Sequence, residues 1–184
     1  PENRVDFRAA RSTDGGRSFS GPVILDSSSC ICCRTAIAAG PDGSVHALWR
    51  HVFPGDIRDF VSARSTDGAT TFSASTRLHE DHWVLNGCPD IGPDVAVDGA
   101  GVVHAAWYTG APGRVGLWYA ASTDGGATFS APVALLPKGH APPSEVKLAT
   151  AQGETWGAWE DRRQLPTTVR MGRPGRGRVI TVGQ

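Results

Sequence analysis

The four cysteines lie in two short segments, Cys30-Ile-Cys32-Cys33 and Asn86-Gly-Cys88-Pro. In an oxidising compartment they would form disulfides, for which four cysteines allow three pairings. Together with His82, six residues before Cys88, they could instead supply thiolate and imidazole ligands to copper or zinc. A redox-active or free-thiol role is the third interpretation, and the spacing alone leaves all three open.

The elements that position these residues are indicated by a repeated segment. Its three copies share Ser-Thr-Asp-Gly followed by a phenylalanine and span 11–20, 64–73 and 121–130. Such a period indicates an array of equal supersecondary units. The aspartate can accept hydrogen bonds from backbone N–H groups of its own turn, and the following glycine can adopt a positive φ. We therefore expect a structural role for the aspartates of the three copies, Asp14, Asp67 and Asp124.

A second repeat alternates with the first, at 43–49, 101–107 and 153–159. Each copy follows a short apolar run and precedes a turn-rich stretch and another strand-like run. The resulting order is strand A, turn, strand B, loop, strand C, Asp-containing turn and strand D. Four antiparallel strands in about 50 residues are typical of a propeller blade. The sequence therefore predicts an all-β propeller.

Charge and hydropathy exclude two classes of partner. Lys plus Arg and Asp plus Glu both number 18, so no net field favours nucleic acid or an anionic membrane. The basic run 170–178 has no interleaved aromatic residue and is interpreted as a solvated turn. No apolar run approaches the roughly 20 residues that span a bilayer. We expect no nucleic-acid partner and no membrane span.

The pattern S-T-D-G-x-x-x-F, three times at this spacing, resembles the Asp-box (BNR) repeats of the sialidase superfamily of propellers. The segments Cys30–Ala36 and Asn86–Pro89 also resemble those of bacterial sialidase-like proteins. The resemblance implies four-stranded antiparallel blades in a six-bladed ring and, together with the clustered cysteines, a secreted or periplasmic location. It implies a fold more than a function, because many functions share this fold.

Counting strands predicts about three and a half blades in the chain. They are a half blade over 1–25 and blades over 26–79, 80–137 and 138–184. An open arc leaves sheet faces unpacked. We therefore expect further N-terminal blades or a second chain to complete the ring.

Propeller topology places the D–A and B–C connections at one end of the blades and the Asp boxes at the other. In sialidase-like propellers the ligand site lies at the end opposite the Asp boxes. All four cysteines fall at that end, and Trp83 is expected to be exposed there, able to stack on a sugar or a partner chain. The predicted ligand face comprises Arg58, Trp83, Arg114, His140 and Arg162.

The sialidase resemblance implies hydrolysis of a terminal sialic acid by an arginine clamp, a Tyr nucleophile activated by a Glu, and an Asp acid/base. The residues that match these roles, and only loosely, are Tyr108, Glu160, Arg50 and Arg34. The family's Arg-Ile-Pro signature is absent from the chain, and a cysteine cluster is no part of that mechanism. We favour a non-catalytic module of the cell envelope that binds a metal, a glycan or an envelope protein. The alternative is an exo-sialidase whose remaining catalytic residues lie in other blades.

Residues that recur in register are predicted to be structural. His46 and His104 occupy one register of strand B, and the tryptophans three residues later, together with Trp159, are expected in the core between blades.

Overall fold

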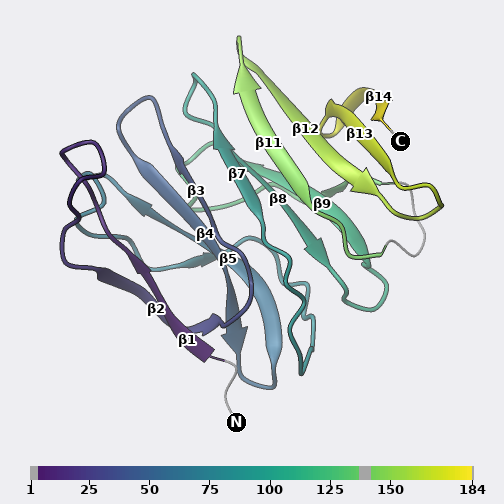
Figure 1. Cartoon of the computed structure of the whole chain (residues 1–184). Coiled ribbons are helices and arrows are strands. Elements are labelled where there is room, and N and C mark those ends of the chain that lie inside the picture. The colour runs from purple at the N-terminus through teal and green to yellow at the C-terminus, as the bar shows by residue number, and fades with distance from the viewer. Residues whose placement is uncertain (1–3, 137–141, 184) are drawn as a thin grey trace.

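The computed structural model describes residues 4–136 and 142–183, which form β-strands and no helix (Figure 1). The first four-stranded antiparallel unit has the order β3-β4-β5-β6. A hairpin of β1 and β2 joins it through one residue pair, Ser29 with His51. The strands of this region are β1 Arg4–Ala9, β2 Val23–Cys30, β3 Ala36–Ala39, β4 Val45–Phe53, β5 Ile57–Ser65 and β6 Thr76–Arg77.

Two further antiparallel sheets follow, with the orders β10-β9-β8-β7 and β11-β12-β13-β14. Their strands are β7 Asp94–Val97, β8 Val103–Thr109, β9 Gly116–Ser122, β10 Val133–Ala134, β11 Val146–Ala151, β12 Glu154–Asp161, β13 Thr168–Arg173 and β14 Arg176–Gly183. The prediction of an all-β fold of four-stranded antiparallel units is confirmed. Among the described residues, no helix is long and apolar enough to cross a membrane.

The sheets meet along their first strands. Figure 1 shows β3, β7 and β11 next to one another, and residues of neighbouring first strands are in contact. Hydrogen bonds between inner strands join the second and third sheets: the Leu148 amide donates to Asp94 Oδ2 over 2.6 Å, and Thr150 Oγ1 donates to the Val97 carbonyl over 3.1 Å. Adjacent sheets turned about a shared line of inner strands are the arrangement of a propeller.

The repeated tryptophans occupy the core, as predicted. Trp49, Trp107 and Trp159 are all at least 97% buried, each in the second strand of its sheet. The indole N–H of Trp49 donates to Asp26 over 2.5 Å, and that of Trp107 donates to Asp81 over 2.7 Å. Buried indoles usually need such an acceptor. Asp26 and Asp81 therefore fix each tryptophan to the segment that enters its own sheet.

His46 and His104 also make internal contacts, in keeping with the structural role predicted for them. His46 Nε2 lies 3.1 Å from Ser44 Oγ. His104 Nδ1 lies 2.7 Å from the Tyr119 hydroxyl, and its Nε2 lies 3.0 Å from Thr155 Oγ1 in the next sheet. His104 thus links two sheets.

The three Asp-containing turns share most of their internal hydrogen bonds. In the second turn, Asp67 Oδ1 accepts the Thr70 and Thr71 amides and the Ser65 hydroxyl, and Oδ2 accepts the Thr71 hydroxyl over 2.6 Å. Gly68 follows with φ +70°. These donors, the Thr71 hydroxyl first, hold the pKa of Asp67 well below its ordinary value.

Each arginine that opens an Asp-containing turn reaches the next turn along the chain. A Cβ at Gly68 would lie 2.8 Å from Arg11 Nη1, and one at Gly125 would lie 2.6 Å from Arg64 Nη1. The third copy opens with Ala121 in place of an arginine. The phenylalanines differ too: Phe72 and Phe129 pack against buried clusters, whereas Phe19 is 65% exposed.

Candidate functional site

The connections opposite the Asp-containing turns are joined to one another by backbone hydrogen bonds. The Arg58 amide donates to the Trp83 carbonyl over 2.8 Å, and the Leu85 amide donates to the Asp56 carbonyl over 3.0 Å. Farther along, the Glu160 amide donates to the Glu145 carbonyl. We call the surface formed by these connections the connection end; it comprises 27–35, 50–58, 80–92, 108–114, 142–145 and 160–163.

Arg50 is buried inside this end, with 1% of its surface exposed. Its Nη1 donates to the Arg58 carbonyl over 2.8 Å, and its Nη2 lies 3.3 Å from the Tyr108 carbonyl. The guanidinium also lies over the Phe60 ring, 3.8 Å from its centroid. Burial lowers the pKa of Arg50 to about 9, so the side chain still carries its charge at neutral pH. This arginine links neighbouring blades.

Tyr108 and Trp83 pack beside Arg50. The expectation that Trp83 is exposed is wrong, because only 9% of its surface is accessible. Two features cause this: Asp59 accepts the Trp83 amide and turns the segment inward, and Gly110 leaves room for the indole, which lies where a Cβ would stand. Tyr108 is 3% exposed, and burial raises the pKa of its hydroxyl.

Arg58 is likewise buried, with 1% of its surface exposed, although it was predicted on the ligand face. Its Nε donates to the Leu85 carbonyl over 2.6 Å, and its Nη1 donates to Cys30 Sγ over 3.3 Å. Arg58 therefore connects the cysteine-bearing end of β2 to the loop that carries Cys88.

All four cysteines are paired in disulfides, Cys30 with Cys33 and Cys32 with Cys88. The second bond joins two successive connections across 56 residues. Cys30 is buried, Cys32 and Cys33 are half-buried, and Cys88 is exposed. His82, predicted as a ligand beside them, is not in the group that these sulfurs form; its Nε2 lies 3.4 Å from Glu80.

The other predicted site residues form ion pairs nearer the surface. Arg34 pairs with Glu145, and Arg162 pairs with Glu160 over 2.5 Å. Arg114 donates to Asp81 over 2.9 Å and is 27% exposed at its side chain. Four of the predicted site residues thus face solvent in part: Glu160, Arg34, Arg114 and Arg162. Four others are buried: Arg50, Arg58, Tyr108 and Trp83. His140 lies outside the described residues.

Three non-glycine residues of the connection end have a left-handed backbone: Asp56, His82 and Asp90, with φ of 56°, 54° and 49°. Such conformations cost roughly 1–3 kcal/mol each and often occur where the surrounding structure fixes a binding loop. Asp59 is one cause here, because its buried carboxylate accepts the His82 amide over 2.9 Å.

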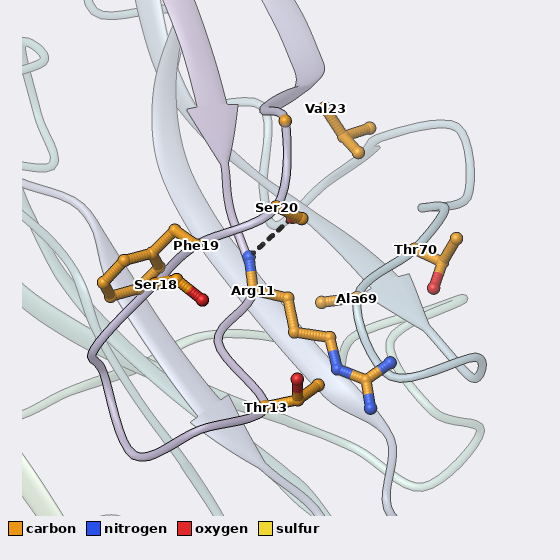
Figure 2. A pocket seen from close by; sticks show the side chains of 9 residues that line it. Arg11, Thr13, Ser18, Phe19, Ser20, Val23, Ala69 and Thr70 are labelled. Carbon is orange, nitrogen blue, oxygen red and sulfur yellow. Dashed lines mark hydrogen bonds between the residues drawn. The ribbon is translucent and has the colours of Figure 1, made fainter.

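The opposite end has a pocket of 470 Å³ between the first two Asp-containing turns (Figure 2). Figure 2 shows Phe19 and the Arg11 side chain at its wall, with the Arg11 amide bonded to Ser20 Oγ over 3.1 Å. This pocket is formed by the repeated turns themselves and holds no predicted site residue.

Two residues missed in the sequence are Asp26 and Asp81, which accept the tryptophan indoles. Asp26 and Asp81 lie 55 residues apart, close to the repeat period. Their equivalent positions in successive repeats could have indicated a shared structural role. Glu145 was also missed, since no pattern marks it.

Solved structures of sialidase-like folds match nearly the whole chain. The Hadza microbial sialidase Hz136 superposes with a TM-score of 0.60 at 19% identity, covering 96% of this chain and 40% of that chain. A protein of unknown function from Dyadobacter fermentans gives 0.66 at 20% identity, covering 95% and 51%. Zg3597, a family 117 glycoside hydrolase of Zobellia galactanivorans, gives 0.59 at 14% identity, covering 98% and 56%. No family model and no curated protein matches.

These likenesses define the fold class: the chain has the sialidase-like β-propeller fold. The chain spans 40% to 56% of the length of these three matched chains. At identities of 20% or lower, the comparison establishes the fold alone.

Proposed function

We propose that the chain is a non-catalytic, sialidase-like propeller module that binds a glycan or an envelope protein through its connection end. The observation that supports this most is the burial of Arg50 and Arg58. A clamp for a substrate carboxylate needs guanidinium N–H groups directed at the ligand. In each of the two residues, two of the three guanidinium nitrogens donate to protein atoms instead.

The loosely matched nucleophile supports the same proposal. Tyr108 is buried, and burial raises the pKa of its hydroxyl, whereas a nucleophile must be accessible to substrate. Glu160, the residue matched to the base of the sialidase mechanism, pairs with Arg162. Hydrolysis by this chain would therefore require a rearrangement of its buried core.

The exposed part of the connection end offers features suited to binding. The ion pairs Arg34–Glu145 and Arg162–Glu160 provide donors and acceptors of both signs. Ile31 and Val84, in connections of the same end, are more than half exposed. Polar groups of both signs around small apolar areas are the usual composition of a protein surface that binds a polar partner.

The setting of this module is part of the proposal. Two disulfides favour an oxidising compartment, such as the periplasm or the outside of the cell. Further blades or a second chain would cover the outer sheet β11-β12-β13-β14, where Val169, Ile180 and Val182 are exposed.

Two assays on one preparation test the proposal: hydrolysis of a fluorogenic sialoside, and binding to a printed glycan array that includes sialylated glycans. We expect no turnover, and binding that Arg34→Ala or Arg162→Ala weakens. Arg17→Ala is the matched control, because Arg17 is an exposed arginine at the opposite end. Sialoside turnover that Tyr108→Phe abolishes would instead support the exo-sialidase alternative.

A further inference from the structure

Three of the four cysteine sulfur atoms at the connection end form one close group, and the fourth is bonded to a member of it. The Sγ atoms of Cys30, Cys32 and Cys33 all lie within 4.8 Å of one another, and Cys88 is bonded to Cys32. The two disulfides approach each other closely, with Cys30 Sγ 3.9 Å from Cys32 Sγ. Cys30, Cys32 and Cys33 lie within four residues of one another, and Cys88 is brought to them from the next connection, 56 residues after Cys32.

The protein holds these sulfurs together by means other than the disulfides. The Leu85 amide donates to the Asp56 carbonyl, and Arg58 bonds both Leu85 and Cys30, so the loop before Cys88 is fixed to the end of β2. Farther along this loop, Gly92 touches Arg34: a Cβ at Gly92 would lie 2.7 Å from Arg34 Cβ. The contacts of Leu85 with Asp56 and Arg58, and of Gly92 with Arg34, involve no cysteine sulfur.

The charge around the cluster suits thiolates. The Arg58 guanidinium is buried and lies 3.3 Å from Cys30 Sγ, where it would offset the negative charge of a sulfur anion. The carboxylate nearest to that guanidinium is Asp56, 4.0 Å from Arg58 Nη2 and half exposed. Several thiolates around one cation carry net negative charge, which a buried arginine compensates.

We propose that the four cysteines, once reduced, bind a single thiophilic ion, Cu(I) or Zn(II). Closely spaced thiolates are the ligands that both ions prefer. This site is independent of the glycan or protein binding proposed above, which concerns the exposed ion pairs of the oxidised chain.

The reduction is a thiol–disulfide exchange with an external dithiol. The dithiol attacks the exposed Cys88 sulfur, the Cys32–Cys88 bond breaks, and Cys32 leaves as a thiolate. The second dithiol sulfur then displaces Cys88, and the dithiol becomes a cyclic disulfide. A second equivalent reduces Cys30–Cys33 in the same way, so two dithiols yield four thiols. The ion then displaces the protons of the thiols that bind it.

Titration of the whole chain tests the proposal. The protein is reduced with dithiothreitol under anaerobic conditions, freed of reductant, and titrated with Cu(I) alone or Zn(II) alone against a chromophoric chelator. We expect about one equivalent of ion per chain and a rise in the Tm of the reduced protein on metal addition. The oxidised protein and the reduced, alkylated protein have identical chains and should bind none.

A pair of variants in one loop separates ligation from folding. Cys88→Ser should weaken binding at least roughly tenfold, the effect commonly seen when even an outer partner of a metal site is lost. Asn86→Ser, two residues earlier in the same loop, should leave the affinity unchanged. Reduced wild-type protein that folds, exposes four titratable thiols and binds neither ion would overturn the proposal, as would equal binding by the alkylated protein. Failure of glycan binding would not affect it.

Discussion

The two ends of the sheets differ in how far the repeat is preserved. At the Asp-containing turns, Asp14, Asp67 and Asp124 accept nearly the same hydrogen bonds. At the connection end, the residue after each core tryptophan changes from Arg50 to Tyr108 to Glu160, and the environment changes from fully buried to half exposed. The end at which the repeat is preserved has structural roles. The end at which the repeat varies contains the cysteines, ion pairs and strained loops of the candidate site.

The largest effect should come from the part that both ends share, the tryptophan core. Trp107 is 1% exposed, so Trp107→Ala should lower the free energy of unfolding by about 3–5 kcal/mol, the usual cost of truncating a large buried side chain. Urea denaturation measures it. Glu160→Ala, at a half-exposed site, should change the free energy of unfolding by no more than about 0.5 kcal/mol. A loss as large as that of Trp107→Ala would contradict the conclusion that the tryptophan core, and not the connection end, carries the stability.

Arginines within the connection end should divide into two classes. Arg50→Ala leaves buried carbonyls without donors and should cost about 1–3 kcal/mol or more, because each such group is costly to bury unpaired. Arg34→Ala removes an exposed ion pair and should cost about 0–1 kcal/mol. The measurement is again denaturant unfolding. Equal effects would mean that burial does not separate the structural arginines from those available to a ligand.

Glycine substitutions should distinguish the three Asp-containing turns from one another. Gly15, Gly68 and Gly125 hold the same place and have φ of 74°, 70° and 71°, so an alanine at each should cost about 1–2 kcal/mol of backbone strain. Gly68→Ala and Gly125→Ala must also displace the arginine of the preceding turn, whereas at Gly15 no arginine of another turn lies within contact. Thermal unfolding should therefore show Gly15→Ala as the mildest of the three.

The smallest effect should appear only in acid. Hydrogen bonds from Ser18 and Ser12 lower the pKa of Asp14 to about 2, and Asp67 and Asp124 shift the same way. Because these folded values lie below that of an unfolded aspartate, about 3.9, their contribution to stability is complete above pH 4 and falls as the pH drops toward 2. The Tm of Asp67→Asn should fall less steeply than that of the wild type across this range. If the Tm of the variant and that of the wild type fell equally with pH, the hydrogen-bonded carboxylate of Asp67 would not contribute to stability as proposed.

Much of the fold could be predicted from the chain because strand patterns and turns are local. The inner strands, the core tryptophans and the turn glycines follow from short segments read in register. The burial of Trp83 could not, because it depends on Asp59 in β5 and on the space left at Gly110. The cysteine pairing could not either, since Cys30, Cys32 and Cys33 are too close in sequence for spacing to select partners.

The reach of Arg11 to Gly68, and of Arg64 to Gly125, bears on how such a chain could be rebuilt. A single blade moved into another protein would lose the contact between its turn glycine and the arginine of the preceding turn. The arginine of its own turn would then lie against a surface that has no matching glycine. The smallest unit that keeps this contact intact is a pair of successive turns with the sheets that bear them. The junctions of chimeras and circular permutants of this chain should therefore not separate two successive Asp-containing turns.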